Sequence, residues 1–136
     1  MTKKARTFVL KCVLSGVLAV LSGCSAGTRS PVGAVRALTE AAQAGDRAEV
    51  WRLVGPRTRA RLTADAQRAG VLAGRRPAPG EQMLAVGWFA PRFTAEQVEE
   101  LSRNGDRATV EVRGAHGERE QVECVRVDGE WKVELP

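Results

Sequence analysis

Few side chains in this 136-residue sequence could combine as nucleophiles, proton carriers or metal ligands. The chain has three Cys, one His and no Tyr. His116 stands between Ala115 and Gly117, a pattern typical of a solvated turn. A general base needs a positioned partner, and one His with one distant Cys is not a metal-ligand set. We therefore predict no catalytic residue, no metal site and no cofactor.

The segment that ends at Cys24 carries the most specific chemical signal. Residues 1–11 are cationic, and residues 13–21 form a short apolar run. A helix that crosses a bilayer needs about 20 apolar residues, so this shorter run after a positive region predicts a secretory signal. The small residues Ser22 and Gly23 stand between this run and Cys24.

The motif Leu21-Ser22-Gly23-Cys24 resembles the lipobox of bacterial lipoproteins. The resemblance implies cleavage between Gly23 and Cys24, a diacylglyceryl thioether on Cys24 and acylation of the new N-terminus. Each buried CH₂ contributes roughly 0.8 kcal/mol, so two or three acyl chains form a stable anchor. A plain signal peptide, or a short membrane helix, with a coincidental Cys is the alternative.

Three segments follow from this resemblance: a signal peptide at 1–23, a lipid-anchor tether at 24–30 and a folded domain at 31–136. The lipid on Cys24 would hold the protein at a membrane of the cell envelope, facing the periplasm or the exterior. Ser25 resembles the residue that permits sorting to the outer membrane in Gram-negative bacteria. Export argues against nucleic acid as a partner.

Charge is distributed unevenly along the chain. The formal net charge is +5, but residues 24–136 carry 17 basic and 16 acidic side chains. Residues 47–92 have a net charge of +6, whereas residues 95–136 have a net charge of −5. The basic half could face anionic lipid headgroups, at about 1 kcal/mol per residue, although a merely solubilising composition is the simpler interpretation. The cations concerned are Arg57, Arg59, Arg61, Arg68, Arg75 and Arg76.

Two helices are predicted at the start of the domain. Ser30 as N-cap and Pro31 at the first position favour a helix start, and Gly45 ends the apolar periodicity that follows. Asp46 can cap a second helix, with Glu49 at capping-box spacing.

A third helix is expected over residues 59–69. Gly55-Pro56 ends the second helix, Thr58 or Thr63 can cap the third, and Gly70 closes it. Residues 70–82, rich in Gly, Pro and Arg, predict a loop.

Strands are predicted in the second half. Residues 83–89 are apolar and favour a buried strand, and residues 94–103 favour an irregular or helical start followed by a strand. Three hairpin-turn dipeptides recur at twelve-residue spacing: Asn104-Gly105, His116-Gly117 and Asp128-Gly129. Between them, apolar and polar residues alternate, as in a sheet packed on one face.

The middle strand departs from this alternation. Val122 and Cys124 share one parity while Val125 and Val127 take the other. This predicts a bulge, or a strand covered on both faces. The apolar setting of Cys124 indicates a buried, inert thiol.

These elements predict an α+β domain with N-terminal helices packed on a curved antiparallel sheet. Residues 41–46 (AAQAGD), 53–56 (LVGP), 104–110 (NGDRATV) and 125–133 (VRVDGEWKV) resemble the NTF2-like, or cystatin-like, superfamily, in particular its small bacterial lipoproteins. The resemblance implies a cone that holds ligands between helices and sheet, and dimerisation through the sheet as one arrangement. Ketosteroid-isomerase-like members use a Tyr that this chain lacks, so no catalytic residue is carried over.

Trp88 and Phe89 are candidates for lining a ligand cavity, although aromatic residues are more often part of the core. The favoured function is a non-enzymatic, membrane-anchored module that binds an envelope protein or a small ligand. One alternative is an enzyme of the NTF2-like type that uses a carboxylate such as Asp46 or Glu81 in an apolar cone, which needs a raised pKa. Another is a structural subunit of an envelope complex.

Overall fold

The computed structural model describes residues 26–85 and 95–136, which form an α+β fold. The helical elements come first: η1 (Ala26–Arg29), α1 (Pro31–Gln43), α2 (Arg47–Leu53), α3 (Pro56–Leu72) and η2 (Gly80–Met83), where η marks a 3₁₀ helix. The strands follow: β1 (Ala95–Asn104), β2 (Arg107–Gly114), β3 (Arg119–Val127) and β4 (Glu130–Glu134). The predicted α+β class is therefore confirmed.

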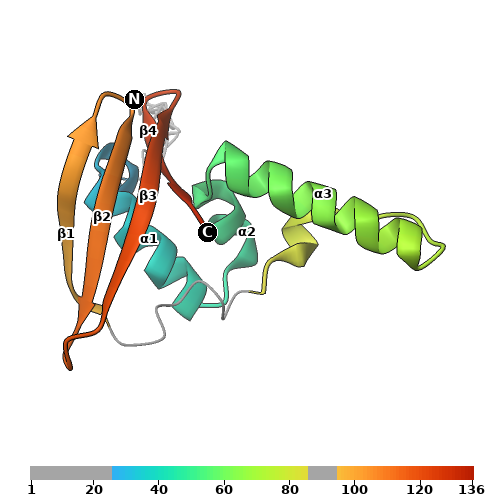
Figure 1. The fold of residues 1–136 in the computed structure, drawn as a ribbon, viewed down its shortest axis with the longest axis horizontal. Helices are drawn as coiled ribbons and strands as arrows, with labels where there is room; N and C mark the ends of the chain where they lie inside the picture. Colours follow the sequence, from blue (N-terminus) through green and yellow to red (C-terminus); the bar gives the residue numbers. More distant parts are fainter. Residues whose placement is uncertain (1–25, 86–94) are drawn as a thin grey trace, which may run out of the picture.

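The helices have two different relations to the sheet (Figure 1). α1 lies across one face and contacts all four strands, whereas α3 projects away from the sheet beside β4 and packs mainly on η2. We call the face under α1 the inner face and the opposite one the outer face. Within the described part of the chain, no helix is long and apolar enough to cross a bilayer.

Local capping chemistry sets α1 and α2 as predicted. Ser30 Oγ accepts a hydrogen bond from the Gly33 amide at 3.0 Å, and Asp46 Oδ1 accepts one from the Glu49 amide at 3.0 Å. These bonds satisfy amides that have no partner in the first helical turn. Glu49 does not complete the capping box, because its carboxylate binds Arg52 instead.

The third helix differs from the prediction at both ends. α3 begins directly after Gly55, which has no capping side chain. It also continues through Gly70, which is buried because a Cβ there would lie 2.7 Å from Pro77 Cα. The helix ends at Leu72 with Ala73 as its C-cap, and Gly74 follows with a positive φ of 62°. Gly70 is therefore a packing glycine and not a helix stop.

The segment after α3 differs from the sequence prediction in its loop and in the strand expected after it. Gly80–Met83 is a 3₁₀ helix inside the predicted loop, so the strand predicted from Met83 does not begin there. Leu84 is 1% exposed and belongs to the core. The rest of that predicted strand, from residue 86 to residue 89, lies outside the described residues.

The sheet is an antiparallel meander in the order β1-β2-β3-β4. All three predicted turns are present, with positive φ at Gly105, Gly117 and Gly129 and also at Asp128. The loops at 105–106 and 128–129 are two-residue hairpin turns, which require this backbone region, whereas β2 and β3 are joined by the four-residue loop 115–118. Residue 95 is already in a strand, so the irregular or helical start expected near residue 94 is absent from Ala95 onward.

The bulges lie in a different strand from the one predicted. The pairing of β2 with β3 has no register shift, whereas β1 has two, between Ala95 and Gln97 and between Glu100 and Ser102. In β3, Val122 lies on the inner face and Val125 on the outer face, both partly buried. The predicted bulge is therefore absent from β3, and the other alternative, a strand covered on both faces, is met only on the inner face, where Cys124 is buried.

The core lies between α1, α2 and the inner face. Trp131 is 2% exposed and packs in this core with residues of all four strands and of the helices.

The folded domain begins earlier than the sequence predicts. Thr28 in η1 is also 2% exposed, and η1 contacts α1 and β4. Residues 26–30 of the predicted tether are therefore part of the folded domain.

Candidate functional site

The principal candidate site is a cavity on the inner face, which we call the inner cavity. Its volume is about 420 Å³, within the range of small-molecule sites. Three groups of elements enclose it: α1, the first half of α3 with η2, and β2, β3 and the C-terminus. The lining residues are Val35, Leu38, Thr39, Arg61, Leu62, Asp65, Met83, Ala85, Val112, Glu120, Val122, Leu135 and Pro136.

Most of this lining is aliphatic, and the helical and strand periods explain why. Val35 and Leu38 lie on one side of α1 because residues three and four apart share a helix face. Val122 of β3 pairs with Val110 of β2. Val112 lies two residues along β2 from Val110, so Val112 and Val122 point to the same inner face. Leu62 of α3 completes the apolar wall. The cavity can therefore hold an apolar group.

The polar groups of the inner cavity are few and differ in their engagement. Thr39 Oγ1 donates to the Val35 carbonyl at 2.9 Å, and the Asp65 carboxylate pairs with Arg68. No ion pair or side-chain hydrogen bond engages Arg61 or Glu120 within residues 26–85 and 95–136. These two side chains, one of each charge, are free to contact the polar end of a ligand.

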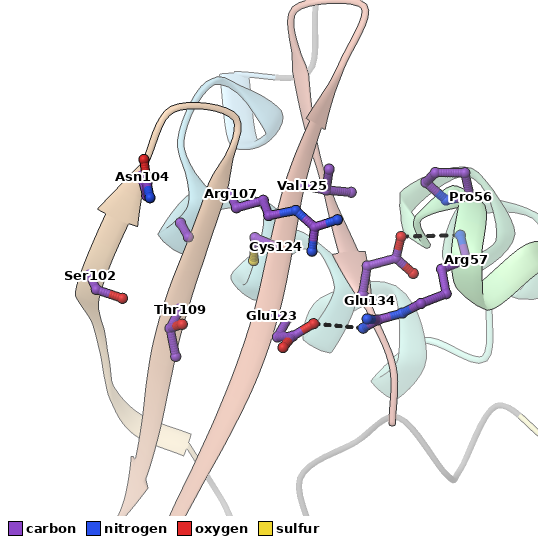
Figure 2. A pocket seen from close by; sticks show the side chains of 11 residues that line it. Pro56, Arg57, Ser102, Asn104, Arg107, Thr109, Glu123, Cys124, Val125 and Glu134 are labelled. Carbon is purple, nitrogen blue, oxygen red and sulfur yellow. Dashed lines mark hydrogen bonds and ion pairs between the residues drawn. The ribbon is translucent and has the colours of Figure 1, made fainter.

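A second hollow, which we call the outer groove, lies on the outer face where β1, β2 and β3 meet the start of α3 (Figure 2). Its volume is about 330 Å³. Arg57 binds Glu123 at 2.6 Å across it, with both side chains more than half exposed. Figure 2 shows Arg107 extending from β2 over the outer face. Opposite charges largely neutralise this groove, and seven of its eleven lining residues are polar or charged.

Glu134 connects the outer groove with the inner cavity. Its carboxylate accepts hydrogen bonds from the amides of Arg57 at 3.1 Å and Thr58 at 2.8 Å and from Thr58 Oγ1 at 2.7 Å. Glu134 thus caps α3 from β4, where Gly55 cannot. Because Leu135 and Pro136 follow it into the cavity wall, the cap fixes the position of α3 relative to the C-terminus.

Among the described residues considered for catalysis or metal binding, all but Cys124 lie apart from both hollows. His116 is exposed in the β2–β3 turn, Asp46 caps α2, and Glu81 lies in η2 without lining either hollow. Cys124 is buried, as predicted, and burial raises the pKa of its thiol to about 12. It borders the outer groove from within β3. No group of three potential metal ligands occurs among the described side chains.

The remaining sequence candidates cannot be placed. Trp88, Phe89, Gly23 and Cys24 lie outside the described residues. Sequence reasoning did not single out Arg61, Leu62 or the C-terminal residues as cavity lining. The apolar periodicity of α1 was the one signal that pointed toward this wall.

Comparisons with known proteins do not add a family to this description. No protein-family model, no curated protein and no solved structure matches the chain.

Proposed function

We propose that this chain is a lipid-anchored envelope lipoprotein whose domain binds a small, largely apolar molecule in the inner cavity, without catalysing a reaction. The observation that carries the proposal is the inner cavity itself: about 420 Å³, enclosed by helices on one side and a sheet on the other, with a mostly aliphatic wall. We also propose that the fold is of the NTF2-like cone type, because the sequence resemblance implies a ligand held between helices and sheet and the inner cavity lies between such elements.

The ligand chemistry follows from the wall. Aliphatic groups from Val35, Leu62 and Val122 favour an apolar body, at about 25 cal/mol per Å² of apolar surface removed from water. Arg61 and Glu120 can contact a polar end of either charge or a neutral hydrogen-bonding group. A fully charged or strongly hydrated ligand is disfavoured, because its desolvation would not be compensated by an aliphatic wall.

Filling the inner cavity tests the binding proposal. Val122→Trp places a large side chain in the cavity, and Val127→Trp is the matched control, because Val127 lies on the opposite face of the same strand. Native mass spectrometry of the full chain should show a small molecule that is released on activation, in the wild type and in Val127→Trp. If the chain is purified empty, both proteins should bind anilinonaphthalene sulfonate saturably in a fluorescence titration. Val122→Trp should lose it.

Three results would count against this function. Equal probe binding by Val122→Trp and the wild type would place the probe elsewhere. A bare chain that binds no probe would favour a structural subunit, to be sought by crosslinking in the intact envelope. Chemical turnover of a bound molecule would favour the enzyme alternative.

The anchor is tested separately, by fractionating cells without detergent. The thiol of Cys24 is the proposed lipid attachment point, so Cys24→Ala should leave the membrane fraction or accumulate unprocessed. Cys12→Ala is the matched control, because Cys12 lies in the expected signal peptide. If Cys24→Ala is processed normally and remains equally membrane-bound, the lipid anchor is wrong, whatever the cavity binds.

A further inference from the structure

The far end of α3 is a surface that the proposed function does not use. We define the tip as residues 68–76, which lie where α3 extends farthest from the sheet (Figure 1). Val71 is 76% exposed and Leu72 is 88% exposed, the highest values among the large hydrophobic side chains described as exposed. These two side chains give the end of the helix apolar surface that the rest of the domain does not cover.

The exposure of these side chains is built into the backbone. The Ala73 amide donates to the Ala69 carbonyl at 3.0 Å, and the Arg75 amide donates to the Gly70 carbonyl at 3.0 Å. Pro77 packs on Gly70 and directs the returning chain along α3. The end of the helix is thus closed by its own hydrogen bonds, which hold Val71 and Leu72 outward.

Charge at the tip is positive only. Arg68, Arg75 and Arg76 are exposed there, and residues 66–80 contain no acid. Asp65 precedes Leu72 by seven residues, roughly 10 Å along a helix that rises 1.5 Å per residue. Glu81 follows Gly80, which packs on Thr63 farther back. Asp65 pairs directly with Arg68, so the cations of the tip that are left for a partner are Arg75 and Arg76.

The structure also separates the tip from the other cations of the basic half. Arg57 binds Glu123, and Arg59 donates to the carbonyls of Trp51 and Arg52, so these two hold α3 to the domain. Among the described residues, neither an ion pair nor a side-chain hydrogen bond engages Arg75 or Arg76. The surface available for a partner is therefore the tip and not the whole Arg-rich segment.

We propose that the tip is a contact site for an anionic phospholipid bilayer, with Val71 and Leu72 entering the acyl boundary and the neighbouring guanidinium groups binding lipid phosphates. Interfacial helices combine these same two elements, aliphatic side chains and flanking cations. The acidic strands of a second copy would match the charge, but a bilayer matches both the charge and the two exposed aliphatic side chains. The lipid on Cys24 would bring the bilayer close, yet the tip chemistry does not depend on the ligand in the inner cavity.

An environment-sensitive fluorophore at the tip tests this contact. The full chain carries Cys12→Ser and Cys24→Ser, and Ala73→Cys supplies the thiol for the label, since Cys124 is buried. Ala48→Cys, on exposed α2, is the matched label position. Vesicles of pure phosphatidylcholine are compared with vesicles that contain one-quarter phosphatidylglycerol, and co-flotation reports binding of the whole chain independently.

The proposal requires a blue shift at position 73, but not at position 48, with the phosphatidylglycerol vesicles. Arg75→Gln/Arg76→Gln should lower the ratio of inserted to free tip about twenty-five-fold, since each cation near an anionic surface contributes roughly a fivefold factor. Val71→Ser/Leu72→Ser should abolish the shift. Arg36→Gln/Arg47→Gln, with the same charge change away from the tip, should stay within about twofold of the parent.

Several outcomes would overturn the proposal. One is an unchanged emission at position 73 in chains that co-float with the anionic vesicles. Another is a full shift in Val71→Ser/Leu72→Ser. A shift that grows with protein concentration in the absence of vesicles would instead assign the tip to a second copy of the chain. None of these outcomes depends on whether the inner cavity binds a probe.

Discussion

Replacing Glu134 is the perturbation that most directly tests how this fold holds its site. The carboxylate is 7% exposed and accepts three hydrogen bonds at the start of α3, from two amides and the Thr58 hydroxyl. Glu134→Ala removes both acceptor oxygens and leaves the three donors without this partner. Loss of a helix cap costs about 0.5–2 kcal/mol, and each hydrogen bond to a charged group contributes about 1.5–3 kcal/mol.

Because these contributions overlap, we expect Glu134→Ala to lower the free energy of unfolding by about 3 kcal/mol. At this chain length each kcal/mol shifts Tm by about 4 °C, so the melting midpoint should fall by roughly 12 °C. Glu134→Gln keeps one acceptor oxygen and should lose about half as much. Thermal and urea unfolding of the full chain, followed by circular dichroism, measure these changes.

Two further variants separate the cap from a general loss of charge. Glu123→Gln breaks only the exposed pair with Arg57 and should cost less than about 0.5 kcal/mol. Gly55→Ala introduces a Cβ 2.4 Å from the Glu134 carboxyl group. It should therefore disrupt the same cap, and its effect should be less than additive with Glu134→Ala.

Hydrogen exchange shows where the stability is lost. Relative to the wild type, Glu134→Ala should increase the exchange rates of the amides of residues 56–72 more than those of β2 and β3. The reason is that α3 depends on η2 and the cap for its position. A loss in Glu134→Ala below about 0.5 kcal/mol, or full additivity with Gly55→Ala, would refute the assignment of Glu134 as the cap.

Three other predictions concern the core and the surface charges. Burial raises the pKa of the Cys124 thiol to about 12, so little of the reactive thiolate is present at pH 8. In a chain whose other cysteines are replaced by Ser, Ellman's reagent at pH 8 should label Cys124 only after urea unfolding. Rapid labelling of the native chain would contradict this. The Arg52 hydrogen bond lowers the pKa of Glu49 from 4.5, so the pair stabilises the fold above pH 4.5 and this contribution disappears as pH falls through the lowered pKa. Measured by urea unfolding, Glu49→Gln should lower the free energy of unfolding by less than about 1 kcal/mol at pH 7 and should match the wild type at pH 2. A difference that persists at pH 2 would exclude the charge pair as its cause. Trp131 is 2% exposed with Arg103 over its ring at 5.2 Å, so Trp131→Ala should cost about 3–5 kcal/mol in the same assay, and a loss below 1 kcal/mol would place it outside the core.

The features that the sequence predicted correctly are those decided within a few residues. Ser30 and Asp46 cap helices through bonds to amides three residues away, and Gly105, Gly117 and Gly129 supply the positive φ of their turns. Such contacts depend on local backbone geometry and recur wherever the residue types recur. The α+β class follows from them, since alternating strands joined by tight turns can only form an antiparallel sheet.

The sites were less accessible to sequence reasoning. The periodicity of α1 indicated an apolar face containing Val35 and Leu38, but nothing in the sequence showed that Leu62 and Val122 lie opposite them across a cavity. The tip was likewise hidden inside an Arg-rich segment, because the sequence does not show that Arg57 binds Glu123 while Arg75 remains exposed.

The sequence by itself determined the class of the fold, its turns and the caps of its first two helices. Only the tertiary structure decided where α3 begins, because its cap, Glu134, lies 76 residues from Thr58. These partners are brought together by the closing of the whole chain, whose entropy cost is met by the packed core and not by any local pattern. For the same reason, the cavity and the exposed tip emerge from packing rather than from motifs.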